Sequence, residues 1–204
     1  MESATTAESS HNAVTYRVDN ATATIHILVS DTREEDAYVV PNTTQTRLED
    51  GTYDYNRKET QGEVLTHWQL YIGKYIAQSV LKLPHARGRQ WRATLPAGYV
   101  LFSKCKSVST KDPSQVRSDS YLKGSSAKFR SPQEFTPHYM WLLENGHQGS
   151  GAECICRWCG PGRKQRDINI QLGLPEPKRA MKPAARRTVV QTGRNALYTR
   201  VAPS

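Results

Sequence analysis

The sequence predicts an α+β protein with a small antiparallel sheet packed against helices, and three observations carry this prediction. Apolar residues recur at helical spacing over residues 63–81. β-Branched residues run together over residues 24–29, which favours a strand. Over residues 120–130, two short apolar runs flank a Gly-Ser-Ser turn signal, and a helix start follows directly. Strands and helices grouped in blocks of this kind are typical of an α+β fold.

The longest helix is expected over residues 63–81. Its apolar stripe consists of Leu65, Trp68, Ile72, Ile76 and Val80. A period of 3.6 residues places these side chains on one face, which is expected to pack in a core. The aromatic residues of this helix are therefore interpreted as core residues rather than as a binding platform.

A second helix is expected where the strands end. Ser131 is a favourable N-cap, Pro132 occupies the first helical position, and Glu134 completes a capping box. Pro137 removes an interior hydrogen bond, so the helix either kinks there or restarts with Thr136 as its cap. The strands expected to form the sheet beneath this helix lie over residues 100–106, 120–122 and 128–130.

Composition limits how much of the chain packs into a core. Hydrophobic residues make up 37% of the 204 residues, against roughly 45–50% in typical globular domains. We therefore expect tails outside the core and divide the chain into four parts. These are a disordered segment over 1–12, a strand and helix region over 13–92, a second unit with the cysteine cluster over 93–160, and a basic, mostly disordered tail over 161–204. Within this tail, one short strand or helix is expected around residues 167–172.

Charge is distributed unevenly along the chain. Residues 1–58 contain 10 acidic and 5 basic side chains, whereas residues 157–204 contain 2 acidic and 11 basic ones. A basic tail on a nearly balanced body is the electrostatic pattern of a protein that binds a polyanion. A solvated tail that only increases solubility is the alternative interpretation.

The N-terminus shows no targeting signal. The first twelve residues are polar and lack the basic and apolar regions of a signal peptide. No apolar run approaches the ~18 residues of a membrane span. We therefore expect a protein of a reducing, intracellular compartment with no membrane partner. Its four cysteines are then thiols or metal ligands rather than disulfides.

Three cysteines fall within six residues, namely Cys154, Cys156 and Cys159. Structural zinc sites have four ligands, often three cysteines and one histidine. His147 is the nearest candidate for the fourth ligand, whereas Cys105 and His138 could reach the site through the fold. No open coordination position with a paired general base is evident, so a structural zinc in a cysteine knuckle is predicted. Three free thiols are the alternative.

Residues 95–143 contain a series of motifs in a recognisable order. A Leu-Pro-x-Gly-aromatic opening over residues 95–99 precedes a strand and a basic loop. An Asp-x-Tyr strand over residues 119–122 follows, and then Lys-Phe-Arg-Ser over residues 128–131 leads into the helix. In this order and at this spacing, the motifs resemble a methyl-CpG-binding domain.

A closer resemblance, over roughly residues 60–160, is to the N-terminal region of the fungal cryptic loci regulator proteins. In that family a Phe-Arg-Ser-Pro-x-Glu-Phe-x-Pro-His motif, here Phe129 to His138, precedes a helix and a short cysteine cluster. The resemblance implies a nuclear protein of heterochromatin silencing. Members serve as adaptors in a complex that holds a nucleosome remodeller and a histone deacetylase. It also implies no enzymatic activity and no small-molecule substrate, in agreement with the lack of a catalytic motif in the sequence.

The methyl-CpG-binding resemblance also assigns residues to a second hypothesis, direct DNA binding. In that family two arginines bind guanines from the major groove. Arg130 matches the second arginine, while the position of the first holds no arginine. Contact with phosphates needs only positive charge, so the basic loop and the basic tail could still bind DNA without reading methylcytosine. The residues assigned to this role are Lys104, Lys106, Lys111, Arg117, Asp119, Tyr121, Lys128 and Arg130.

Overall fold

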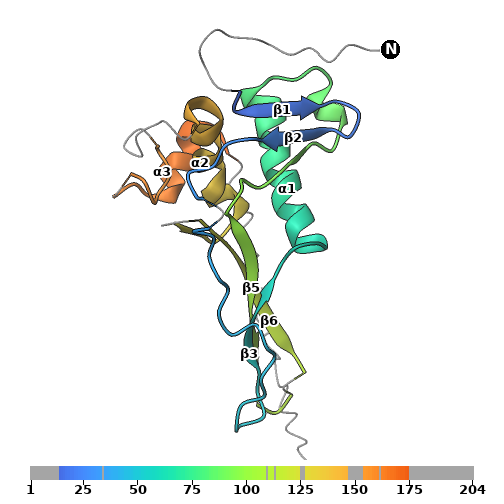
Figure 1. Cartoon of the computed structure of the whole chain (residues 1–204), viewed down its shortest axis with the longest axis vertical. Helices are drawn as coiled ribbons and strands as arrows, with labels where there is room; N and C mark the ends of the chain where they lie inside the picture. The colour runs from blue at the N-terminus through green and yellow to red at the C-terminus, as the bar shows by residue number, and fades with distance from the viewer. Residues whose placement is uncertain are drawn as a thin grey trace, which may run out of the picture.

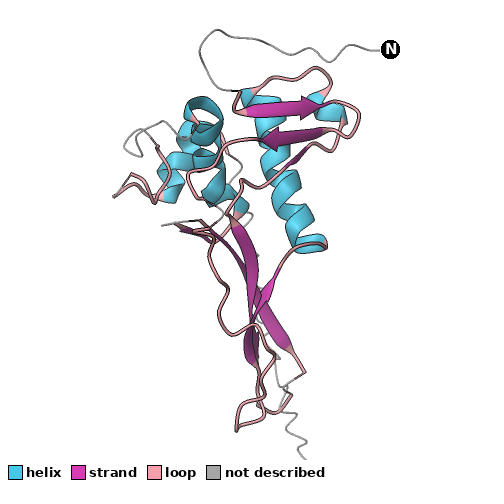
Figure 2. Cartoon of the chain, viewed as in Figure 1, coloured by secondary structure: helices cyan, strands magenta, loops and turns pink. Residues whose placement is uncertain are grey.

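The computed structural model describes residues 14–33, 35–108, 110–112, 114–124, 127–146, 154–160 and 162–174. The strands are β1 (Tyr16–Asp19), β2 (Thr24–Ile27), β3 (Asp54–Lys58), β4 (Arg92–Ala93), β5 (Val100–Ser107), β6 (Val116–Lys123) and β7 (Lys128–Phe129). The helices are α1 (Glu63–Tyr75), α2 (Pro132–Asn145) and α3 (Gln165–Leu172), with a π-helical turn η1 (Ile76–Val80) and a 3₁₀ turn η2 (Ala86–Gly88). The fold is α+β, as predicted (Figure 2). The disorder expected over 1–12 and in the last thirty residues lies outside this description, and no described helix could cross a membrane.

A small sheet covers one side of α1 (Figure 1). In it β2 pairs antiparallel with β1 and parallel with β4. The helix approaches β4 closely at Gly73, where an added Cβ would lie 2.5 Å from the Trp91 carbonyl oxygen. Glycine at this position therefore allows the helix and the strand to pack backbone to backbone.

The predicted long helix is present, and its last turn has changed hydrogen bonding. Trp68, Ile72 and Ile76 are fully buried, as the apolar stripe predicted. The α-helical pattern ends at Tyr75, and the Leu81 N–H donates to the Ile76 carbonyl oxygen, five residues back. Such a π-type turn widens the helix locally before the chain leaves it.

The second sheet has the order β3-β5-β6-β7 and is antiparallel throughout. Its strands β3, β5 and β6 extend away from the helices as a narrow arm (Figure 1). The predicted strands over residues 100–106, 120–122 and 128–130 correspond to β5, β6 and β7. Strand β3 lies in a stretch that was expected to be polar and turn-rich. It forms because β5 provides a partner along its whole length.

Helix α2 begins as the capping box predicts, because Ser131 Oγ accepts a hydrogen bond from the Glu134 N–H at 3.2 Å. The helix neither restarts nor ends at Pro137. Thr136, the alternative cap, is buried inside the helix, and its hydroxyl donates to the Pro132 carbonyl at 2.8 Å. Since Pro137 has no N–H, the Gln133 carbonyl accepts instead from Gln165 Nε2 of α3 at 3.4 Å.

Candidate metal centre

Four donor groups converge between the middle of α2 and the turn that precedes α3. His138 comes from α2, and the turn supplies Cys154, Cys156 and Cys159. Their ligand atoms all lie within 4.8 Å of one another. His138 Nδ1 is 3.4 Å, 3.9 Å and 3.6 Å from the sulfur atoms of Cys154, Cys156 and Cys159, respectively. A cluster of this size is close enough to bind one metal ion.

The turn that carries the cysteines is folded around the Cys156 sulfur. The Cys159 N–H donates to Cys156 Sγ at 3.4 Å, and the Gly160 N–H donates to the Cys156 carbonyl at 2.9 Å. Both bonds reverse the chain so that the third sulfur returns beside the second. Cys154 and Cys156 are buried, and Cys159 is partly exposed at the edge of the cluster.

The opposite edge of the His138 ring is held by a carboxylate and a phenol. Asp31 Oδ2 lies 3.2 Å from His138 Nε2, and the Tyr99 hydroxyl lies 2.8 Å from the same nitrogen. The Tyr99 hydroxyl donates to Asp31 Oδ1 at 2.7 Å. A carboxylate in this place keeps the proton on Nε2 and leaves the Nδ1 lone pair free to bind a metal. The donor set and its surroundings therefore fit a metal ligand histidine.

Protonation within the cluster follows from these contacts. A hydrogen bond from Cys154 lowers the pKa of the Cys156 thiol to about 4, against the opposing effect of burial. The same bond, together with burial, raises the pKa of Cys154. Burial lowers the pKa of His138, but hydrogen bonds to Asp31, Cys156 and Cys159 outweigh it and raise this pKa to about 11. Burial raises the pKa of Asp31, and the bonds from His138 and Tyr99 lower it further than burial raises it.

Aromatic side chains surround the histidine. Its ring stacks on Trp141 at 5.5 Å between centroids, and the Phe129 and Phe135 rings lie at 5.5 Å and 5.9 Å. His138 is 1% exposed. The ring is therefore fixed both by hydrogen bonds and by packing, which orients Nδ1 toward the sulfur atoms.

The structure brings together the three predicted cysteines and one of the two rivals for the fourth position. His147, the fourth ligand preferred from the sequence, lies outside the described residues. His138 already completes a set of four donors. Cys105, the other rival, is buried in β5, where its Sγ lies 3.8 Å from the Ser103 carbonyl and 3.8 Å from Ser118 Oγ. It does not belong to the cluster.

Most of the residues assigned to DNA binding share one face of the second sheet. Lys104 pairs with Asp119, and Lys106 pairs with Arg117, across β5 and β6. Directly opposed side chains of an antiparallel pair project from the same face. Tyr121, opposite Phe102, continues this face. The Lys128 amine of β7 then lies 4.1 Å above the centre of the Tyr121 ring.

The charges on this basic face interact with one another. Burial lowers the pKa of the Lys128 amine, and the positive charges of Arg130, Lys104 and Lys123 lower it further. Arg117 forms an ion pair with Asp119 at 3.2 Å. Arg130 is exposed and forms no ion pair with any residue that the structure describes. Lys111 is exposed on the loop between β5 and β6. The face thus gathers cations without neutralising all of them.

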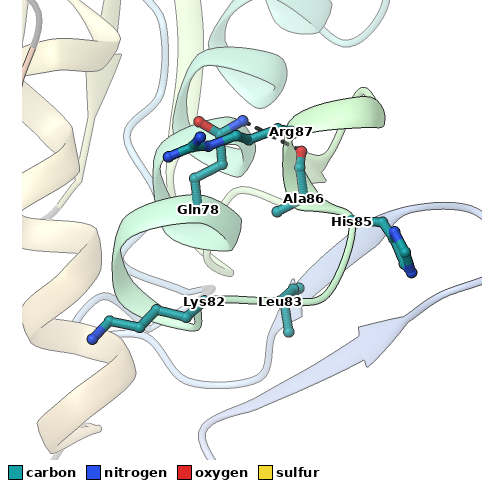
Figure 3. A pocket seen from close by; sticks show the side chains of 6 residues that line it. All are labelled: Gln78, Lys82, Leu83, His85, Ala86 and Arg87. Atoms are coloured by element: carbon teal, nitrogen blue, oxygen red, sulfur yellow. Dashed lines mark hydrogen bonds between the residues drawn. The ribbon is translucent and has the colours of Figure 1, made fainter.

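A hollow of about 320 Å³ at the end of α1 gathers basic side chains but no common site. Its lining includes Gln78, Lys82, His85 and Arg87. Figure 3 shows Lys82 and His85 pointing in opposite directions, away from the other two side chains. The Gln78 amide is already bonded to the Ala86 carbonyl at 3.3 Å. These polar groups do not converge on one point, so the metal centre is the better candidate site.

Residues 91–159, which run from Trp91 just before β4 to the last cysteine of the centre, match the model of one protein family. That family is described as transcription-silencing protein, cryptic loci regulator Clr2. Through this segment, the chain belongs to the Clr2-type transcription-silencing family. The Clr2-type segment contains β4 to β7, α2 and all four donors of the metal centre. Its family membership indicates a role in transcriptional silencing.

No curated protein and no solved structure matches the chain. The likeness of the Clr2-type segment to a methyl-CpG-binding domain therefore stays a prediction. The expected order of strands followed by a capped helix is present in β5, β6, β7 and α2.

Sequence reasoning missed two residues of the centre. Asp31 was interpreted as part of an acidic loop, and Tyr99 as part of a strand-opening motif. Asp31 lies far from His138 in the sequence and outside the Clr2-type segment. Only the packing of the loop after β2 against α2 brings the carboxylate to the ring. Tyr99 could have been suspected, because a tyrosine directly before a buried strand often has a hydrogen-bond partner.

Proposed function

We propose that this chain is a non-catalytic chromatin adaptor in heterochromatin silencing, which docks onto a nuclear complex of the histone deacetylase and remodeller type. The observation that carries the proposal is the match of residues 91–159 to the Clr2 family. The resemblance noted in the sequence supplies the kind of complex. A nuclear location and the absence of catalysis belong to the same proposal.

The metal centre supports a structural role in this adaptor. Three cysteines and one histidine fill the four positions that zinc takes in structural sites, and leave none for a substrate. When bound, zinc would tie the cysteine turn to α2. The chain's own residues contribute the donors, the orientation of His138 and the exclusion of water by the surrounding aromatic rings.

Elemental analysis of the purified chain tests this part of the proposal. We expect one zinc per chain, which is lost when Cys156 is changed to serine. Cys105→Ser is the matched control, because Cys105 is buried but lies outside the cluster. A folded chain without metal, or equal loss of metal in the control, would contradict a structural zinc.

Affinity purification of the tagged chain from its own nuclei tests the adaptor role. After nuclease treatment, mass spectrometry should detect a histone deacetylase and a remodeller. Loss of every partner after nuclease treatment would argue against the adaptor and favour direct DNA binding.

Direct DNA binding is the second candidate, and the basic face of the β5–β6 arm favours it. A two-stranded β-ribbon fits the major groove of DNA. The exposed cations Lys104, Lys106 and Arg117 lie along this ribbon. Phosphate-driven binding should weaken steeply as salt is raised from about 50 to about 200 mM. The paired variant Lys104→Glu/Lys106→Glu should abolish the affinity for duplex DNA, and Arg130→Ala should reduce it.

A further inference from the structure

A second hollow, of about 290 Å³, opens on α2 beside the metal centre. Five of its lining residues come from one stripe of α2, and the sixth comes from the cysteine turn. They are Pro137, Met140, Trp141, Glu144 and Asn145, with Ile155. Pockets for drug-sized ligands occupy roughly 300–1,000 Å³, so this pocket is suited to a single side chain rather than to a cofactor.

The wall of this pocket contains a hydrogen-bond donor without a partner. The Trp141 side chain is 7% exposed, and its Nε1–H is buried and has no hydrogen-bond partner. Leaving a buried donor unpaired costs about 1–3 kcal/mol. The Trp141 ring cannot easily turn to find a partner, because it stacks on His138 at 5.5 Å. A ligand that brings an acceptor oxygen would satisfy this donor.

The other walls define the rest of the ligand. Pro137, Met140 and Ile155 present apolar surface, which suits an aliphatic side chain. Glu144 is exposed at the pocket and adds a negative charge to a chain whose net charge is otherwise strongly positive. A cationic group next to the aliphatic side chain would therefore be attracted to this position.

The pocket is built on a fixed frame. Ile155 lies between Cys154 and Cys156, two donors of the metal centre, and Trp141 packs on the third donor, His138. The two walls are thus held by the groups that build the centre. A preformed wall reduces the ordering cost of binding a flexible peptide.

We propose that this pocket binds a short basic peptide segment of a partner protein. One aliphatic side chain of the peptide enters the pocket, a carbonyl oxygen of the peptide accepts from Trp141 Nε1, and an adjacent lysine or arginine approaches Glu144. This inference rests on the adaptor function proposed above and names the chemistry of one docking site.

The test uses the purified full chain labelled with ¹⁵N and an end-blocked pentapeptide with leucine between two arginines. The chain has four tryptophans, so four indole N–H signals can be assigned with single Trp→Phe variants. We expect saturable movement of the Trp141 signal at millimolar peptide, with no movement of the Trp158 signal. A Trp141 signal that stays in place would overturn the proposal.

Two variants separate the contacts. Trp141→Phe keeps an aromatic ring on His138 but removes the donor, so the Kd of the peptide should rise about tenfold. Trp158→Phe, which changes an exposed indole, is the matched control. Glu144→Gln should weaken the arginine peptide and remove its preference over a peptide with glutamates in place of the arginines. Equal affinity of Trp141→Phe and the parent chain, or equal affinity for both peptides, would contradict the proposal.

The outcome is independent of the purification from nuclei. If the complex is recovered but the peptide does not move the Trp141 signal, the adaptor function stands and this pocket is not its docking site. If the peptide binds but no complex is recovered, the pocket stands and the proposed complex is wrong.

Discussion

Asp31 and His138 form an ion pair with 3.2 Å between Asp31 Oδ2 and His138 Nε2, on the edge of the ring opposite the three sulfur atoms. The pair connects the N-terminal sheet region with α2. It also fixes which nitrogen of the imidazole faces the cysteines. The loop after β2 therefore contributes to the metal centre although it supplies no ligand.

Replacing Asp31 with asparagine should weaken metal binding. The variant loses the negative charge that keeps the proton on Nε2 and increases the basicity of Nδ1. Loss of such a partner typically reduces metal affinity by about 10–100-fold. Competition with a chromophoric chelator measures this change, and Asp36→Asn, an exposed acid of the same loop, is the control. Unchanged zinc affinity in Asp31→Asn would show that the pair does not support the centre.

The fourth ligand can be identified by parallel substitution of the two candidate histidines. We expect His138→Ala to lose the metal and His147→Ala to keep it. His138→Cys restores four donors and should bind zinc again, which distinguishes loss of a ligand from loss of the fold. Elemental analysis gives the metal content of each variant. Retention of zinc in His138→Ala together with loss in His147→Ala would reverse the assignment.

Metal binding should release protons and strengthen as the pH rises. In the metal-free chain the pKa of His138 is raised to about 11 and the pKa of Cys154 is raised as well, so both groups carry a proton at pH 7. Zinc requires an unprotonated Nδ1 and a thiolate. Two released protons correspond to a change in affinity of about two orders of magnitude per pH unit.

Calorimetry in buffers of different ionisation enthalpy measures the number of protons released. We expect at least two at pH 7, with weaker binding at pH 6 than at pH 8. Binding that is independent of pH over this range would mean that the free site is already deprotonated.

Sequence reasoning predicted those parts of the fold and the site that depend on local chemistry. The helical stripe around Trp68 and the capping box at Ser131 are visible in short windows, and both are present. The cysteine cluster was likewise found from its spacing alone. Such features arise from neighbours in the chain, so a single sequence shows them.

The parts that could not be predicted depend on contacts between distant segments. Strand β3 is too polar to be identified by its pattern and exists because β5 pairs with it. Asp31 reaches His138 only through the packing of the loop after β2. Pro137 stays in a continuous helix because Gln165, from another helix, bonds the carbonyl that proline leaves unpaired. In each case tertiary contact overrides the local preference.

The contact between α1 and β4 gives a final prediction on stability. Changing glycine to alanine inside a helix normally stabilises it by up to about 1 kcal/mol. At Gly73 the added Cβ would lie 2.5 Å from the Trp91 carbonyl oxygen and 2.5 Å from the Arg92 carbonyl carbon, both of which are backbone atoms. Backbone cannot move aside as a flexible side chain can, so Gly73→Ala should instead lower the free energy of unfolding by about 1–3 kcal/mol. Urea denaturation measures the change, with Gly88→Ala as the control because nothing lies within 4 Å of a Cβ there. A Gly73→Ala variant as stable as the parent would mean that α1 and β4 are not packed as closely as described.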